Sequence, residues 1–232
     1  MRIRKNILII MTLLLCACNE KQKTEQKSKL IIESKTEIKS NSELNNDYSK
    51  SAELFANEVL KENIRIHSFN IKNSENPRHL KIFQSNGLEK IVAYSDKNYP
   101  KKTNPINYQH FILFVATYSN NQKAETAFNQ IKKDALKYEM FDNLESLDKK
   151  DYERVIGLII GVKPGGLITQ NGKQIFSLVE TCRNTPIGGT WYEYERKFLN
   201  FISKNRNEIE VLNSDCGKMG NYVIEKRTKA GR

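Results

Sequence analysis

The chain has 232 residues, of which 38% are hydrophobic, and a formal net charge of +11. This length is enough for one domain with a sizeable core and is not clearly enough for two. We do not expect nucleic acid as a partner, because the basic residues are scattered and no aromatic-basic motif accompanies them.

The first eighteen residues, MRIRKNILIIMTLLLCAC, have the pattern of an export signal. Arg2, Arg4 and Lys5 precede an apolar run from Ile7 to Ala17. This run is too short for a membrane span, which needs about 20 residues. Removal of the signal would lower the formal charge from +11 to +8.

Residues 15–18, Leu-Cys-Ala-Cys, resemble the lipobox of bacterial lipoproteins. The resemblance covers only this segment and implies cleavage before Cys18, which would carry a diacylglyceryl thioether and an N-acyl chain such as palmitate. Several acyl chains, at ~0.8 kcal/mol per buried methylene, make such anchoring effectively permanent. Cys16 is a poor rival, because Leu15 would stand where the signal peptidase needs a small side chain. An ordinary secretory signal cut near Ala17 is the alternative.

The resemblance also implies a location in the cell envelope, anchored to the cell membrane or the outer membrane. Enterobacterial lipoproteins that stay in the inner membrane carry Asp after the lipidated cysteine, whereas this chain has Asn19. Outer-membrane delivery is therefore implied where the cell has two membranes. The domain would then lie in the periplasm or at the cell surface.

Three segments follow from these patterns: a signal peptide at 1–17, the lipidated cysteine with a disordered tether at 18–48, and one globular domain at 49–232. The tether is rich in Lys, Glu, Gln, Ser and Asn. Such a composition cannot bury enough apolar area to offset the entropy of ordering. As a coil of about 30 residues it would reach about 30 Å.

The first half of the domain should contain two helices and several strands. Apolar spacing predicts a helix near 50–62 and an imperfect strand over 64–71. Asn86-Gly87 between residues 80–85 and 88–94 predicts a type I′ hairpin. A long apolar strand over 107–118 precedes an amphipathic helix at about 122–140, which Asn120 or Asn121 can cap.

The second half should be richer in hairpins. A strand is predicted over 154–162, and Asn171-Gly172 predicts a hairpin that joins 167–170 to 173–180. Thr190 and Glu193 have capping-box spacing, which predicts a helix from Trp191. Strands over 208–213 and 221–227 end the domain. The order of elements predicts an α+β fold, a hairpin-rich antiparallel sheet with about three helices packed mainly on one face.

The four cysteines divide between the anchor and the domain. Cys16 leaves with the signal and Cys18 carries lipid, so Cys182 and Cys216 remain as a pair. An oxidising compartment makes a disulfide the default for such a pair. A reactive thiol is the alternative, but no motif supplies an activating base.

No motif for catalysis, metal or cofactor is found. The histidines His67, His79 and His110 are far apart, and the zinc motif H-E-x-x-H is missing. The segment 166–173 superficially resembles a phosphate loop, but its spacing is one residue too long and Gln174 follows where Ser or Thr is required. We expect neither a catalytic residue nor a metal ligand.

The most plausible interaction surface is formed by Trp191, Tyr192 and Tyr194, beside Gly188-Gly189. Aromatic side chains with polar ends suit recognition of a protein or a glycan. They equally suit the core side of the predicted helix. Glu193, in the same first turn, is better explained as a stabiliser of the helix dipole than as a general acid.

Three classes of function fit these features. We favour a non-enzymatic binding module held in the envelope, such as an accessory subunit, an inhibitor or an immunity-type protein, with a protein partner there. The alternative is an envelope hydrolase of peptidoglycan, lipid or peptide, which would need His67, His110 and a Glu to converge in a cleft. A purely structural spacer would need no concave site.

Overall fold

The structure is a computed structural model that describes residues 47–72, 78–96, 111–137, 165–180, 182, 189–203, 208–214, 216 and 222–228. All of them belong to one compact unit, Asn46–Arg232. The signal peptide, Cys18 and the strand at 154–162 lie outside the described residues and stay predictions.

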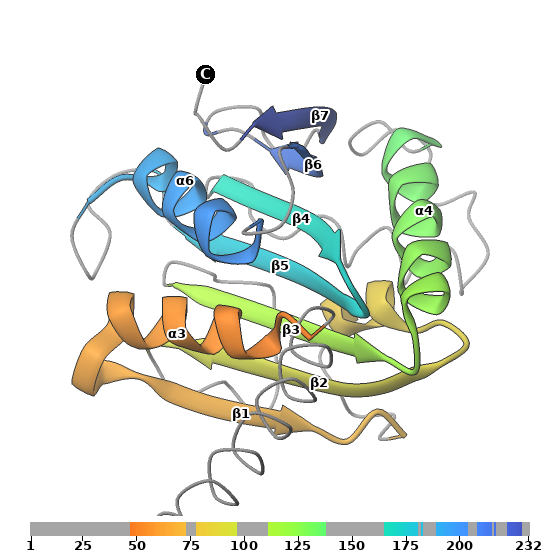
Figure 1. Cartoon of the computed structure of the whole chain (residues 1–232), viewed down its shortest axis with the longest axis horizontal. Helices are drawn as coiled ribbons and strands as arrows, with labels where there is room; N and C mark the ends of the chain where they lie inside the picture. The colour runs from red at the N-terminus through yellow and green to blue at the C-terminus, as the bar shows by residue number, and fades with distance from the viewer. Residues whose placement is uncertain are drawn as a thin grey trace, which may run out of the picture. The chain divides into compact units, whose positions relative to one another are not determined.

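Seven strands form one sheet in the order β1-β2-β3-β5-β4-β6-β7, and every neighbouring pair is antiparallel (Figure 1). The strands are β1 Arg65–Phe69, β2 Leu88–Ser95, β3 Ile112–Tyr118, β4 Gly165–Asn171, β5 Gln174–Glu180, β6 Glu208–Ser214 and β7 Val223–Thr228. The predicted α+β class with an antiparallel sheet is confirmed.

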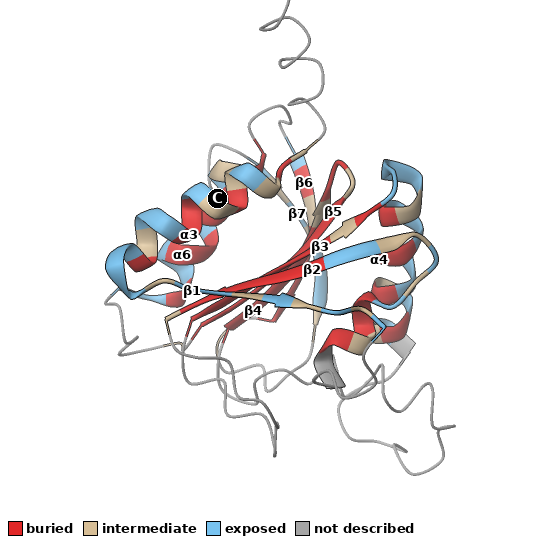
Figure 2. Cartoon of the chain, turned by 90° about the horizontal axis from the view of Figure 1, so that it is seen from below, coloured by how far each residue is buried: buried red, intermediate tan, exposed pale blue. Residues whose placement is uncertain are grey.

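Helices cover both faces of the sheet (Figure 2). Helices α3 (Ser49–Leu60) and α6 (Trp191–Ile202) lie on one face, and α4 (Asn121–Lys137) lies on the other. Two of the three described helices therefore share a face, as predicted. Within the described part of the chain, no helix is long and apolar enough to cross a membrane.

The sheet separates two hydrophobic cores, and strand β3 contributes to both. Ile112, Phe114 and Ala116 pack with α4, whereas Leu113 and Val115 pack with α3 and α6. A strand that is buried on both faces has a continuous apolar sequence instead of an alternating one. This explains the long apolar run from which the strand was predicted.

Side chains at the helix starts make the predicted capping contacts. The carboxylate of Glu193 accepts a hydrogen bond from the backbone N–H of Thr190 at 2.6 Å, at the start of α6. The side-chain oxygen of Asn120 accepts one from the N–H of Lys123 at 3.0 Å, at the start of α4. Each contact satisfies a backbone donor that a helix end leaves free.

The hairpin predicted over 80–94 is wrong in its first half. Residues Arg78–Phe83 form a 3-10 helix, η2, and β2 pairs with β1 and β3 instead. Leu80, Ile82 and Phe83 are all buried, so they do not alternate between core and solvent as a hairpin strand would. The hydroxyl of Tyr118 also donates to the carbonyl of Phe83 at 2.6 Å, which holds this segment on the sheet.

The second predicted hairpin, formed by β4 and β5, is confirmed. Its two-residue turn is Gly172-Lys173, one position later than the predicted Asn171-Gly172. Gly172 takes a positive φ of 56°. Glycine adopts this backbone conformation without the steric cost that a side chain would bring.

Cys182 and Cys216 are joined by a disulfide, with 5.5 Å between their Cα atoms, as predicted. Cys182 lies just after β5, and Cys216 lies in the connection between β6 and β7. The bond therefore links two neighbouring hairpins at the end of the sheet where β5 and β6 finish.

Candidate functional site

The structure does not bring the three predicted aromatic contact residues onto one surface. Trp191 is fully buried against Gly165, and Tyr194 is buried with its ring 6.1 Å from that of Phe111. Tyr192 alone is exposed, at 49%. Trp191 and Tyr194 therefore belong to the core beneath α6.

The histidines also form no described cluster. His67 lies on the edge strand β1, whereas His110 and the side chain of His79 fall outside the described residues. No three His, Cys, Asp or Glu side chains of the described residues are grouped so that they could hold a metal ion. Glu195 on α6 is paired with Arg227 on β7 at 3.2 Å and so ties this helix to the edge of the sheet.

A row of four polar side chains crosses the sheet on the face that carries α3 and α6. The strand register places Lys90 opposite Thr117, Thr117 opposite Gln174, and Gln174 opposite Asn171. The next row along the same face contains Val92, Val115 and Phe176 and is apolar apart from Thr169. Polar side chains at such positions need partners, because burial without hydrogen bonds is costly.

Two members of the row, Gln174 on β5 and Asn171 on β4, hold chain segments in place. The side-chain oxygen of Gln174 accepts a hydrogen bond from the N–H of Tyr48 at 3.1 Å, and its amide donates to Asp47 at 3.0 Å. The amide of Asn171 donates to the carbonyl of Ile202 at 2.6 Å. Gln174 thus fixes the start of α3, and Asn171 fixes the end of α6.

Asp47 and Tyr48, which the predicted boundary at residue 48 assigned to the tether, therefore pack with the domain. Tyr48 is buried, with 7% of its surface exposed, and packs in the same core as α3. Composition alone placed Asp47 and Tyr48 in the tether, because the contacts that order them come from a strand more than a hundred residues later.

Asp47 is surrounded by hydrogen-bond donors. One carboxylate oxygen accepts from the backbone N–H of Ser49 at 2.9 Å and from its hydroxyl, and the other lies 3.7 Å from the ammonium of Lys173. Burial acts to raise the pKa of Asp47, but the two hydrogen bonds from Ser49 and the charge of Lys173 outweigh it and lower the pKa below 3.8. Asp47 is therefore a charged structural cap.

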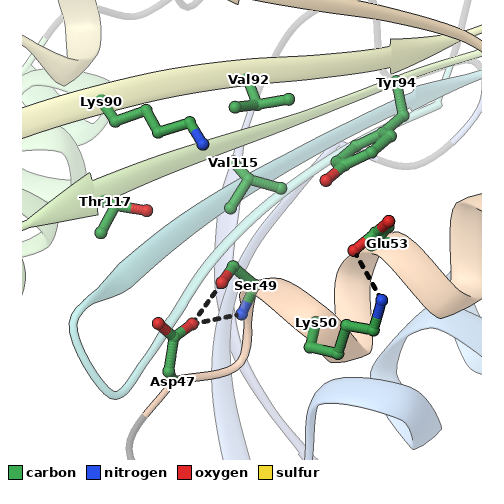
Figure 3. A pocket seen from close by; sticks show the side chains of 9 residues that line it. All are labelled: Asp47, Ser49, Lys50, Glu53, Lys90, Val92, Tyr94, Val115 and Thr117. Carbon is green, nitrogen blue, oxygen red and sulfur yellow. Dashed lines mark hydrogen bonds and ion pairs between the residues drawn. The ribbon is translucent and has the colours of Figure 1, made fainter.

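The other two members of the row, Lys90 and Thr117, face a pocket of about 270 Å³ between the start of α3 and strands β2 and β3 (Figure 3). Their side chains lie on the same face of the sheet as those of Val92 and Val115, which form the apolar floor of the pocket. The complete lining consists of Asp47, Ser49, Lys50, Glu53, Lys90, Val92, Tyr94, Val115 and Thr117. The pocket thus has charged walls and an apolar base.

An irregularity in β2 directs Lys90 toward this pocket. The pairing of β2 with β3 shifts register between Leu88 and Lys90. Leu88 packs in the core with α4, whereas Lys90 and Val92 lie on the opposite face. In a regular strand, residues two apart share a face. The bulge therefore allows Leu88 to pack, partly buried, against the core on one face while Lys90 lines the pocket on the other, and bulges often redirect side chains in this way near functional sites.

Tyr94 and an ion pair close the far side of the pocket. Burial and the nearby charge of Glu53 raise the pKa of Tyr94 to about 12, so its hydroxyl stays protonated at neutral pH. Glu53 itself pairs with Lys50 at 3.1 Å. The pocket therefore offers the ammonium of Lys90 and the hydroxyls of Tyr94 and Thr117 as hydrogen-bond donors.

The sequence contains only a weak signal for this site. Thr117 and Gln174 are polar residues inside apolar strands, which marks them as unusual. Their alignment with Lys90 depends on the strand order and on the bulge, and neither follows from the sequence.

Comparisons of the chain with protein-family models, with curated proteins and with solved structures gave no match.

Proposed function

We propose that this chain is a lipid-anchored protein of the bacterial cell envelope whose domain is a non-enzymatic binding module. The anchor rests on the lipobox resemblance of residues 15–18. The binding role rests on the pocket between α3 and strands β2 and β3. Accessory subunits, inhibitors and immunity-type proteins of envelope systems belong to this class.

The proposal depends on one observation, that the four residues of the polar row have two different roles. Gln174 and Asn171 hold the helices, whereas Lys90 and Thr117 point into an open pocket. A concave site with an apolar floor and a few convergent polar groups is the usual form of a ligand site. Such a site also favours a binding module over a pure spacer.

The positions of the two ends of the sheet support the same role. Asp47, where the tether meets the domain, lies beside Gln174 at one end of β5, and the disulfide follows the other end at Glu180. A seven-residue strand such as β5 separates these ends by roughly 20 Å. Tyr192, at the start of α6, lies toward the disulfide end, away from Asp47, and is accessible to an envelope protein.

The anchor is tested by replacing Cys18 with Ser in the full chain. We expect the wild type to fractionate with membranes and to carry an acylated N-terminal cysteine in mass spectra of the mature protein. The C18S variant should lose both properties. A wild-type N-terminus without acyl groups, or unchanged membrane fractionation of C18S, would show that the anchor is wrong.

The binding role is tested by site-specific photocrosslinking in intact cells. A photoreactive residue replaces Lys50, which lines the pocket, in one variant and Lys133, on the opposite face of the sheet, in the control. We expect a defined adduct with an envelope component only from position 50. No adduct from position 50, or the same adducts from both positions, would contradict a binding role for the pocket.

A further inference from the structure

The charges around the pocket leave one cation without a counter-charge. Lys50 pairs with Glu53 at 3.1 Å, and Lys173 lies 3.7 Å from Asp47. Lys90 has no carboxylate within ion-pair distance among the residues that the structure describes. Among the two lysines of the pocket lining, Lys90 is therefore the one whose ammonium pairs with no described carboxylate.

Two neutral donors line the same pocket as this ammonium. The hydroxyl of Thr117 comes from the residue directly opposite Lys90, and that of Tyr94 comes from the same face of β2 (Figure 3). An ammonium and hydroxyl groups can all donate to the oxygens of an anion. This donor set suits a group that accepts several hydrogen bonds.

A single unpaired ammonium favours a monoanion as its partner. A phosphate monoester carries about −1.5 to −2 at pH 7, which a single unpaired ammonium does not balance. Asp47 and Glu53 also line the pocket and would repel a second negative charge. A carboxylate has the charge that one ammonium neutralises.

The apolar floor of the pocket indicates which kind of group is attached to that carboxylate. Val92 and Val115 form an apolar surface one row beyond Lys90 and Thr117. Their exposed fractions are 8% and 2%, so only a narrow apolar area remains uncovered. A short aliphatic group attached to the carboxylate would cover this area and gain hydrophobic contact.

We infer that this pocket binds a carboxylate that carries a short apolar side chain, with Lys90 as the charge partner and Thr117 and Tyr94 as hydrogen-bond donors. A peptide C-terminus and a small free carboxylic acid share this chemistry. The inference rests on the proposed binding function and specifies its ligand class.

The first experiment measures the reactivity of lysine side chains in the full-length lipoprotein in detergent. Acetylation rates of Lys90 and Lys133 are followed by mass spectrometry, with and without N-acetylalanine. We expect N-acetylalanine to slow acetylation of Lys90 several-fold and to leave Lys133 unchanged. N-acetylalaninamide, which lacks the charge, should protect neither residue. Equal protection by this amide, or stronger protection by methyl phosphate, would overturn the inference.

The second experiment identifies the source of the carboxylate. A tetrapeptide that ends in Ala with a free C-terminus is titrated by calorimetry beside N-acetylalanine, and the peptide amide serves as control. Tighter binding of the peptide acid indicates a peptide C-terminus, and equal affinities indicate a small free acid. Failure of both acids to bind would overturn the inference.

Variants distinguish the effect of losing the Lys90 charge from the effect of unfolding the domain. We expect K90M to weaken binding of the acids about tenfold or more, T117V to weaken it less, and K133M to leave it unchanged. Unfolding curves that match the wild type establish that K90M is folded, and equal affinity of K90M and wild type would overturn the inference. A crosslink from position 50 without carboxylate binding would refute this ligand class and leave the proposed binding function standing.

Discussion

Gly165 lies directly against the indole ring of Trp191. A Cβ atom at position 165 would come within 2.1 Å of Cδ2 and 2.3 Å of Cγ of this ring. Neither β4 nor the first turn of α6 can accommodate that atom without moving. The glycine therefore sets how closely this helix approaches the sheet.

Replacing Gly165 with Ala should destabilise the domain by about 2 kcal/mol, the usual cost of overpacking a filled core. Equilibrium unfolding in urea measures this change. The matched control is G166A, whose Cβ would meet the outer end of the Tyr222 side chain, with the hydroxyl at 3.0 Å and the nearest ring carbon at 3.7 Å. A smaller loss in G165A than in G166A would contradict this account of the packing.

Removing the disulfide should cost about 4 kcal/mol. The bond joins residues 34 positions apart, and the loop-closure model gives this magnitude for such a loop. Urea unfolding of the oxidised wild type is compared with that of the double variant C182S/C216S. The reduced wild type should match the variant, and no difference between oxidised and reduced protein would refute the prediction.

Asp47 should make the stability of the domain sensitive to acid. Its pKa is lowered in the folded state, so its contribution is complete above about pH 3.8 and is lost as the pH falls through the folded-state pKa. Urea midpoints between pH 2.5 and 6 measure this dependence. We expect D47N to flatten it and S49A, which removes one donor, to flatten it in part. An identical acid profile for D47N and wild type would exclude the cap.

Tyr94 should act in the opposite pH range. Its pKa is raised to about 12, so the unfolded chain loses the phenolic proton first, and stability falls as the pH rises from about 10 to 12. The absorbance of phenolate at 295 nm should show one tyrosine fewer titrating at high pH in Y94F. Unfolding of Y94F should depend less on pH in this range, and an unchanged dependence would contradict the raised pKa.

Local sequence signals predicted the elements that depend on local contacts. The helices α3, α4 and α6 follow from apolar spacing and caps, and the β4–β5 hairpin follows from its turn residues. The segment Arg78–Phe83 was misassigned because the Asn86-Gly87 pair suggested a strand before it. The buried contacts that hold this segment, such as the bond from Tyr118, come from a distant part of the chain.

The candidate site was harder to predict than the fold. The aromatic residues Trp191 and Tyr194 were predicted to contact a partner, but both fill the core. Aromatic residues at the start of a helix can equally pack inward, as Trp191 does against Gly165 of β4. Lys90 and Thr117 are unremarkable in the sequence and become neighbours only through the order of the strands. A functional site that is assembled by sheet register leaves little trace in a single sequence.

The attachment of Asp47 and Tyr48 to Gln174 has a mechanical consequence. Tension applied to the residues before Asp47 would first load two side-chain hydrogen bonds and one ion pair, and only then the backbone ladder of the sheet. These contacts would yield before the seven strands do, so α3 would peel away while the cross-linked hairpins at the other end stayed intact. The contacts of Asp47 and Tyr48 would thus break first under tension, and their loss would change the pocket that Asp47 lines.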